Sequence, residues 1–281
     1  MQIPNRAFAR VWAACALACA SLASAQPAQA RLPQPAHVVV IVEENKSFAQ
    51  IIGNTNAPAI NDFARHAALF TNAHGVTHPS LPNYLAMFAG ITNDNGDDCP
   101  ATGISPSAPN LGSELLAAHR SFAGFSEGLP VSGSTVCAAG SYARKHAPWV
   151  AFDNIPRADN RRLAELPRSF DRLPTVSFII PDVDDDMHDG TIAAGDTWLH
   201  AHIGALMKWA DTHDTLLVLT WDEGFDLSNT IPTVLYGPMI APGRYAQHIS
   251  HYELLRTVED LYGLAPTGHA KDARDITGCW R

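Results

Sequence analysis

Residues 77–90 read Thr77-His78-Pro79-Ser80-Leu81-Pro82-Asn83-Tyr84-Leu85-Ala86-Met87-Phe88-Ala89-Gly90 and predict a tight loop that runs into a buried helix. Ser80 stands where an N-cap is expected, and Pro82 falls in the first turn, where a missing N–H costs nothing. Apolar side chains then recur at helical spacing. A hydroxyl at a helix start lies near unpaired N–H groups and the positive end of the helix dipole, so Ser80 either caps the helix or faces a bound phosphate.

Upstream of this helix, the sequence His37-Val38-Val39-Val40-Ile41-Val42 predicts a strand that is buried on both faces, as in parallel sheets. The polar run Glu43-Glu44-Asn45-Lys46-Ser47 follows directly. Ligands of α/β sheets bind at the carboxyl ends of the strands, so this run either lines a site or forms a solvated turn.

Downstream, two more apolar runs end in polar residues. Residues 175–180 precede a loop rich in Asp that contains His188, and residues 215–221 precede Asp222 and Glu223. Because the carboxyl ends of parallel strands meet at one edge of a sheet, we expect these groups to gather with Glu44, Asn45 and Ser80. Carboxylate and amide oxygens suit Mg²⁺, Ca²⁺ or Mn²⁺. For most of the Asp run, a solvated loop is the alternative.

The remaining pattern alternates between strand and helix. The sequence predicts helices over 56–67 and 111–119, and strands over 69–73, 121–126 and 233–236. It also predicts a helix that is capped by Asp196 and runs to about Ala210. A last helix is expected from the Ser250–Glu253 capping box to Leu261. Residues 92–109 and 129–174 read as irregular. This alternation predicts an α/β sandwich with a central, mostly parallel sheet flanked by helices, in a single domain over 37–281.

One motif points to a different enzyme class. Gly124-Phe125-Ser126-Glu127-Gly128 matches the G-x-S-x-G pattern of carboxylester hydrolases, which requires a strand that turns sharply into a helix. Residues 129–133 contain Pro and Gly and do not start a helix, so we do not expect Ser126 to be a nucleophile.

The N-terminus predicts export. Arg6 and Arg10 precede an apolar run, and Ala23-Ser24-Ala25 offers a cleavage site, so we assign 1–25 to a signal peptide and 26–36 to a linker. This places the protein in the periplasm or outside the cell, with no stable membrane anchor. The net charge of −9 becomes −11 once two arginines leave with the peptide, which argues against nucleic acid as a partner.

Three of the five cysteines follow the predicted signal peptide: Cys99, Cys137 and Cys279. An exported protein meets an oxidising compartment, so one disulfide is expected. Cys99 and Cys137 both lie in loop-rich sequence and are the predicted pair, although the sequence alone does not fix the pairing.

Five segments together resemble the phosphoesterase family of bacterial acid phosphatases and phospholipases C, within the alkaline phosphatase superfamily. They are HVVVIVEENKSF (37–48), HPSLPNYL (78–85), DMHDG (186–190), TWDEG (220–224) and YELLRTVEDLYGL (252–264). The resemblance covers nearly all of the chain after its leader. The length and the leader look most like the family's secreted acid phosphatases, whose relatives include phosphatidylinositol 3-phosphatases.

The resemblance implies a set of site residues. Its metal ligands would be Glu44, Asn45, Asp222 and Glu223. Ser80 would be the nucleophile that forms a phosphoserine intermediate, and Asn83 would hold a phosphate oxygen. His188 would protonate the leaving group, with His78 and Asp189 as weaker candidates beside the substrate. One or more divalent cations (Mg, Ca, Mn or Zn) are implied, but superfamily members with two zinc ions have Asp-His where this chain has Asp222-Glu223.

The resulting hypothesis is an exported, metal-dependent phosphomonoesterase that acts on a small phosphate ester or a phosphoinositide. A phosphodiesterase of the phospholipase C type is the nearest alternative. A non-catalytic exported protein that binds a metal at the acidic edge is a further alternative. The sequence gives no indication of the oligomeric state.

Overall fold

The computed structural model describes residues 32–281, besides Met1. The predicted signal peptide (1–25) and residues 26–31 of the predicted linker therefore lie outside the described residues. Residues 32–36 have no regular secondary structure and lead into the first strand.

A nine-stranded sheet forms the centre of the domain, in the order β10-β2-β9-β8-β1-β7-β3-β6, with β11 also paired to β2. Its strands are β1 (His37–Glu43), β2 (Ala68–His74), β3 (Phe122–Ser126), β6 (Asn160–Arg162), β7 (Val176–Ile180), β8 (Thr215–Trp221), β9 (Thr230–Tyr236), β10 (Gly243–Tyr245) and β11 (Ile249–Ser250). Only the pairs made by β9, with β8 and with β2, are antiparallel among these described strands. The prediction of a mostly parallel α/β sheet is confirmed.

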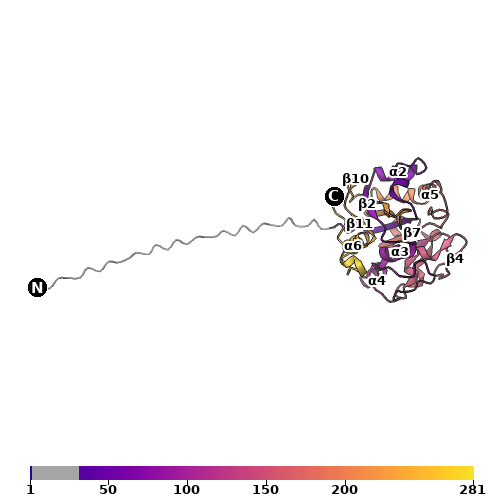
Figure 1. The fold of residues 1–281 in the computed structure, drawn as a ribbon, viewed down its shortest axis with the longest axis horizontal. Coiled ribbons are helices and arrows are strands. Elements are labelled where there is room, and N and C mark those ends of the chain that lie inside the picture. The colour runs from indigo at the N-terminus through magenta and orange to yellow at the C-terminus, as the bar shows by residue number, and fades with distance from the viewer. Residues whose placement is uncertain (2–31) are drawn as a thin grey trace. The chain divides into compact units, whose positions relative to one another are not determined.

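Helices cover the sheet (Figure 1). They are α1 (Phe48–Ile51), α2 (Pro58–Arg65), α3 (Ser80–Ala89), α4 (Leu111–Ala117), α5 (Ile192–Ala210) and α6 (His251–Leu261). Helix α2 packs against α5, while α3 packs against α4 and α6. Short 3₁₀ turns and a two-stranded ribbon complete the chain: η1 (Arg144–His146), η2 (Pro148–Ala151), η3 (Arg157–Asp159), η4 (Leu163–Glu165), η5 (Phe170–Arg172), η6 (Gly268–Lys271), β4 (Ala138–Ala139) and β5 (Tyr142–Ala143).

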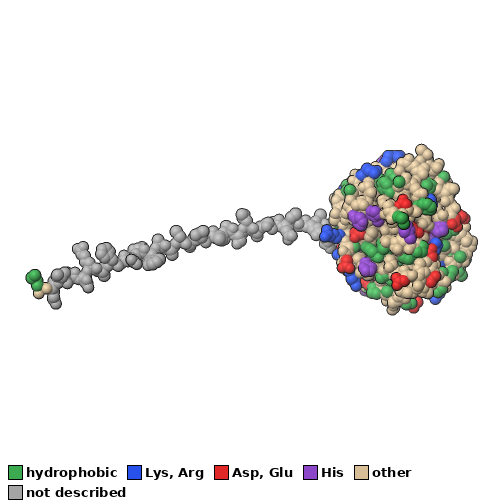
Figure 2. All heavy atoms as spheres, in the orientation of Figure 1, with side chains coloured by type: hydrophobic (Ala, Val, Ile, Leu, Met, Phe, Trp, Pro, Cys, Tyr) green, Lys and Arg blue, Asp and Glu red, His purple; other side chains and the backbone are tan. Residues whose placement is uncertain are grey.

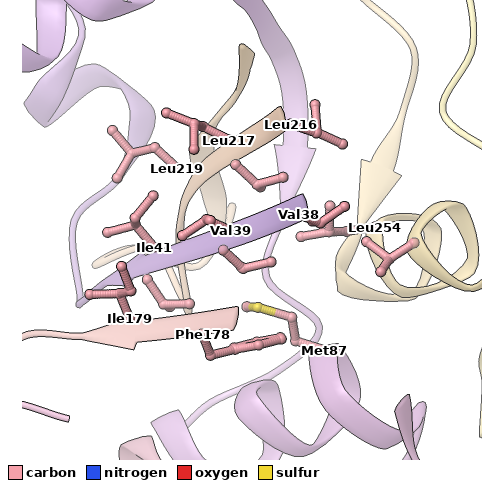
Figure 3. Close-up of a cluster of buried hydrophobic side chains, with 14 of the residues drawn as sticks. Val38, Val39, Ile41, Met87, Phe178, Ile179, Leu216, Leu217, Leu219 and Leu254 are labelled. Atoms are coloured by element: carbon pink, nitrogen blue, oxygen red, sulfur yellow. The ribbon is translucent and has the colours of Figure 1, made fainter. Parts of the chain in front are cut away.

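The core lies on both faces of the central strands, as their continuous apolar runs predict. All seven residues of β8 are buried, and so are all five of β7. On one face, Phe178 lies near Met87 of α3, and Val38 and Leu216 lie near Leu254 of α6 (Figure 3). Strands buried in this way hold their ends rigidly, which is what a site built on loops requires.

Three neighbouring strands deliver the polar residues that the sequence singles out. Strand β1 pairs with β8 on one side and with β7 on the other, all parallel. Strand β2 also runs in this direction, because both β2 and β8 are antiparallel to β9. The loops that follow β1, β2, β7 and β8 therefore leave the same edge of the sheet, which confirms the arrangement expected from the sequence.

Two sequence-based interpretations are wrong in detail. Asp196 does not cap its own helix, because α5 begins four residues earlier, at Ile192, with Thr191 as the N-cap. The buried Asp196 carboxylate instead accepts hydrogen bonds from the backbone N–H groups of Ala59 and Ile60, at 3.1 and 2.8 Å, and so caps α2. Residues 129–174 are also not wholly irregular, since β6 adds a parallel strand beside β3.

Other expectations hold. Cys99 and Cys137 form a disulfide, and Cys279 is free and buried. Ser126 ends β3 as a buried residue and is followed by a turn rather than a helix, so the esterase motif lacks its required geometry. Within the described part of the chain, no helix combines the length and the apolar character needed to cross a membrane.

Candidate active site

Ser80 lies at the start of α3 but is not its N-cap, which corrects the prediction by one residue. Pro79 occupies the cap position, and Ser80 is the first helical residue. The cap hydrogen bond comes from a distant loop, since the Asp97 carboxylate accepts from the N–H of Leu81 at 2.8 Å. The Ser80 hydroxyl is therefore free to point elsewhere, and it donates to Oε2 of Glu44 at 3.0 Å.

Glu44 is the central carboxylate of the site. It follows β1 directly and is fully buried. Its Oε2 accepts from the Asn45 side-chain amide at 3.0 Å as well as from Ser80. Asn45 adopts a left-handed backbone with φ of 53°, a conformation that asparagine tolerates better than most residues. Burial opposes charge on Glu44, but His146 and then Lys145 lower its pKa.

Asp222 and Glu223 reach the same place from the end of β8. Oδ1 of Asp222 accepts from the backbone N–H of Asn45 at 3.1 Å, which ties the β8 end to the β1 end. Its Oδ2 is buried without a hydrogen-bond partner. Burial, then Glu44 and Glu223, raise the pKa of Asp222 well above its usual value. Glu223 is hydrogen-bonded to the imidazole of His78, in the loop before α3.

The loop after β2, which leads to Ser80, packs closely against the loop after β8. Gly75 begins the loop that leads to Ser80, and its N–H donates to the carbonyl of Asn229 at 2.9 Å. A Cβ atom at Gly75 would lie 2.6 Å from the Asn229 side-chain oxygen and 2.9 Å from the carbonyl oxygen of Asp222. Only glycine fits at this position, so the loop after β2 is held directly on the loop after β8.

Sequence reasoning missed His146, which lies in η1. The ring is buried, with Nε2 at 2.9 Å from Oε1 of Glu44 and Nδ1 at 3.1 Å from Oδ2 of Asp186. Burial opposes charge on the ring, but Glu44 and then Asp186 raise the pKa of His146. Asp186 belongs to the Asp run after β7, for most of which a solvated loop was the alternative, yet its side chain is fully buried.

Several contacts hold the segment of His146 against the site. The Cys99–Cys137 disulfide joins segments that are 38 residues apart. Lys145 forms an ion pair with Asp97, the residue that caps α3, at 2.8 Å. The ring of Tyr84, on α3, stacks on the His146 ring with centroids 5.2 Å apart. The sequence around Asp97 and Lys145 has no helical or strand pattern of apolar residues. Only the predicted disulfide indicates that the two segments lie close together.

His188 and Asp189 lie at the same edge. Nδ1 of His188 is 2.7 Å from a carboxylate oxygen of Asp189, and Nε2 is 3.3 Å from Nζ of Lys145. The backbone N–H of His188 donates to Asp186 at 2.7 Å. The His188 ring lies 5.9 Å from that of His146, between centroids. His188 is half-buried, whereas Asp189 is exposed.

Asn83 is engaged entirely within its own loop. Its side-chain oxygen accepts from the N–H groups of Val76 and Thr77, at 2.8 and 3.0 Å. Its amide nitrogen donates to the carbonyls of Thr77 and Pro79, at 2.8 and 3.1 Å. The side chain is fully buried and shapes the loop in front of Ser80.

The residues present fit a divalent cation. The buried Oδ2 of Asp222 lacks a hydrogen-bond partner. Oε1 of Glu44 and Oδ2 of Asp186 are paired with the buried His146 ring. The ligand atoms of Glu44, His146 and Asp186 lie within 4.8 Å of one another. Buried carboxylates that repel one another are costly unless a positive charge compensates them, and His146 and Lys145 supply only part of that charge.

The comparison with protein families agrees with this geometry. A family model described as "Phosphoesterase family" matches residues 54–265. The chain belongs to the phosphoesterase family. Ser80, Asn83, His146, His188 and the residues after β8 lie inside the match, while Glu44 and Asn45 precede it.

Known proteins support the same assignment. The phosphoesterase is 52% identical over 257 residues to "Phosphatidylinositol-3-phosphatase" of Mycobacterium tuberculosis, covering 90% of this chain and 85% of that one. It is 32% identical to "Acid phosphatase" of Aspergillus fumigatus over 73% of this chain, a match that spans half of the fungal protein. A solved structure from Vibrio parahaemolyticus, of a protein in the alkaline phosphatase superfamily, shares the fold with a TM-score of 0.66 at 12% identity, over 89% of this chain and 71% of that one. The phosphoesterase is thus an enzyme that hydrolyses phosphoric esters.

Proposed function

We propose that this phosphoesterase is a metal-dependent phosphomonoesterase in which Ser80 attacks phosphorus and forms a phosphoserine intermediate. The observation that carries the proposal is the hydrogen bond from the Ser80 hydroxyl to the buried Glu44 carboxylate, at 3.0 Å. This contact supports Ser80 as the nucleophile and Glu44 as the acceptor of its proton, because the hydroxyl lies at a helix start.

In the first step, a bond forms between Oγ of Ser80 and phosphorus, and the bond to the leaving oxygen breaks. The serine proton passes to Glu44. His188 protonates the leaving oxygen through Nε2, while Asp189 holds Nδ1 and Lys145 lies beside Nε2. In the second step, water attacks phosphorus and gives a proton to His188, the bond between phosphorus and Oγ of Ser80 breaks, and phosphate leaves. Glu44 then returns its proton to Ser80. Phosphoryl transfer depends mainly on positioning and on stabilisation of charge.

Two sets of ligands sharing Glu44 are available to hold divalent cations. One set is Asn45, Asp222 and Glu223 with Glu44, and the other is His146 and Asp186 with Glu44. When bound, a cation would lower the pKa of the Ser80 hydroxyl and neutralise phosphoryl charge. The oxygen-rich set suits Mg²⁺, Ca²⁺ or Mn²⁺, and the imidazole of His146 extends the choice to Zn²⁺.

The roles of Asn83 and His78 are indirect in this proposal. Asn83 positions the loop before Ser80, because all its hydrogen bonds go to that loop. His78, bonded to Glu223, is half-exposed at the mouth of the site, where it meets an incoming substrate.

The identity of 52% to a phosphatidylinositol-3-phosphatase supports phosphatidylinositol 3-phosphate or a similar monoester as the substrate. A monoester also fits the acid phosphatase relatives better than the diester of a phospholipase C. The disulfide is typical of oxidising compartments and supports export through the predicted signal peptide.

A phosphate-release assay tests the function. EDTA-treated enzyme is given p-nitrophenyl phosphate, its bis ester, or a water-soluble short-chain phosphatidylinositol 3-phosphate, with each divalent ion restored in turn. We expect turnover of both monoesters to return with one or more ions, and the bis ester to react far more slowly. Ser80→Ala should abolish turnover, whereas the matched variant Ser126→Ala should retain it. Full activity in EDTA, or preference for the bis ester, would contradict the proposal.

A further inference from the structure

Few large apolar side chains of the domain are exposed, and the two most exposed lie in one loop. Among residues 32–281, the large hydrophobic residues classed as exposed are Val131, Val136, Phe225 and Leu227. Val131 and Val136 lie in the segment after β3, and Phe225 and Leu227 lie in the loop after β8. Strand β8 runs parallel to β1, so Phe225 and Leu227, which follow it closely, lie at the edge of the sheet that carries Ser80.

Phe225 and Leu227 are the most exposed of the four. Phe225 is 75% exposed and Leu227 is fully exposed. They stand two and four residues beyond Glu223, which faces His78 in the candidate site. Apolar side chains that stay exposed to water bury no surface on folding, so Phe225 and Leu227 do not stabilise the fold. Exposed apolar patches of this kind mark interaction sites.

The loop is held in place. The Ser47 hydroxyl accepts from the N–H of Phe225 at 3.0 Å and donates to the Asp226 carboxylate at 2.9 Å. The same carboxylate accepts from the N–H of Ser228 at 2.9 Å, and the Asn229 side chain accepts from the N–H of Gly224 at 2.7 Å. These bonds anchor the loop backbone while Phe225 and Leu227 project outward, so their display is a fixed property of the loop.

We propose that Phe225 and Leu227 insert into the hydrocarbon boundary of a phospholipid bilayer and place the site over membrane-borne substrate. This proposal rests on the proposed function, because phosphatidylinositol 3-phosphate presents its phosphate at a membrane surface while its acyl chains stay in the bilayer. An enzyme that hydrolyses it in place must bring Ser80 to the surface, and the loop beside the site is where contact is made.

We expect the loop to bind the membrane by inserting its apolar side chains, rather than by electrostatic attraction to lipid headgroups. The loop carries Asp226, and the Asp-rich loop after β7 lies at the same edge. The chain has a net charge of −9, and on the face shown in Figure 2 acidic and basic side chains are both scattered among apolar and histidine side chains. Such a surface is not attracted to anionic phospholipids, so we expect binding to neutral phosphatidylcholine that changes little with salt.

Vesicle sedimentation and two forms of one substrate test the proposal. The wild type, Phe225→Ser/Leu227→Ser and the matched apolar control Phe225→Trp/Leu227→Trp are sedimented with pure phosphatidylcholine vesicles. Each is then assayed on short-chain phosphatidylinositol 3-phosphate in solution and on the long-chain lipid in phosphatidylcholine vesicles. We expect the serine variant to sediment less and to lose about tenfold or more of its vesicle activity, with soluble activity within about twofold of wild type. The tryptophan variant should retain both activities.

The outcomes separate the two proposals. Failure of the wild type to cleave soluble phosphatidylinositol 3-phosphate would reject the proposed substrate, while sedimentation with pure phosphatidylcholine still tests insertion. Equal vesicle activity in the wild type and the serine variant would reject insertion, and so would an equal loss on soluble and vesicle substrates. Brominated phosphatidylcholine should quench the added fluorescence of Leu227→Trp relative to wild type, and no added quenching would also reject insertion.

Discussion

Replacing Asn83 with alanine tests whether this residue shapes the loop before Ser80 or binds phosphate directly. The Asn83 side chain makes four hydrogen bonds to the backbone of residues 76–79, at 2.8 to 3.1 Å, and is fully buried. Alanine removes all four and leaves two N–H groups and two carbonyls without these partners. We therefore expect Asn83→Ala to lower stability as well as activity.

The size of the effect follows from the bonds lost. A net value of about 1 kcal/mol for each hydrogen bond gives a loss of about 3–4 kcal/mol in the free energy of unfolding. The loop would then no longer hold Ser80 against Glu44, and misplacement of a nucleophile by about 1 Å can cost roughly 100-fold in rate. We expect kcat/KM on p-nitrophenyl phosphate to fall by about this factor.

Asn61 provides the matched control. Its side-chain amide donates to the carbonyls of Ile51 and Ala57, both at 2.8 Å, and its oxygen accepts from Gly53 at 2.7 Å. It thus holds a loop in the same way as Asn83, at a position outside the candidate site. At about 1 kcal/mol for each of these hydrogen bonds, Asn61→Ala should destabilise the protein by about 3 kcal/mol and leave kcat/KM unchanged when the protein is folded.

Urea unfolding and steady-state kinetics decide between the two roles of Asn83. A fall in activity with unchanged stability would refute the positioning role and favour direct contact with phosphate. Unchanged activity in a destabilised Asn83→Ala protein would show that the loop does not need this residue to present Ser80.

Two further predictions concern stability. Asp196→Ala should lower the free energy of unfolding by about 1–2 kcal/mol, because the carboxylate caps α2 from α5; urea unfolding checks this, and a neutral effect would contradict it. Burial raises the pKa of Glu259 from 4.5 to about 7, so the folded protein binds this proton more tightly than the unfolded chain. Stability should therefore fall as pH rises through this range, by up to about 3 kcal/mol, and Glu259→Gln should remove that part of the fall in urea unfolding measured at each pH. Parallel pH profiles for the wild type and Glu259→Gln would show that the group is not perturbed.

Much of the fold could be predicted because its strands carry continuous apolar runs. Residues 37–42 and 215–221 are β-branched or leucine-rich, and both become central parallel strands. Short strands such as β6 carry no such run and become strands only by pairing with a neighbour, as β6 does with β3. Asp196 was assigned to the wrong helix because a side chain inside one helix can cap another, and spacing along the chain does not reveal this.

The candidate site could likewise be predicted where its residues follow strands, but not where they lie in irregular segments. Glu44, Asn45, Asp222 and Glu223 follow strands that are neighbours in the sheet, so their meeting could be predicted. His146 could not, because a disulfide and the Asp97–Lys145 ion pair bring its irregular segment to the site. Asp97 likewise lies in a stretch that reads as irregular, yet it caps α3 and leaves the Ser80 hydroxyl free to bond Glu44.

The covalent intermediate on Ser80 is the most direct test of the mechanism. Wild-type enzyme is mixed with a phosphate monoester and its activating ion, quenched in acid within one turnover, and digested for mass spectrometry of the peptide that contains Ser80. We predict a phosphoryl group on Ser80 that disappears on a longer chase without substrate and that is absent in Ser80→Ala. Turnover by Ser80→Ala close to wild type, or a phosphoryl group trapped on another residue, would contradict the account.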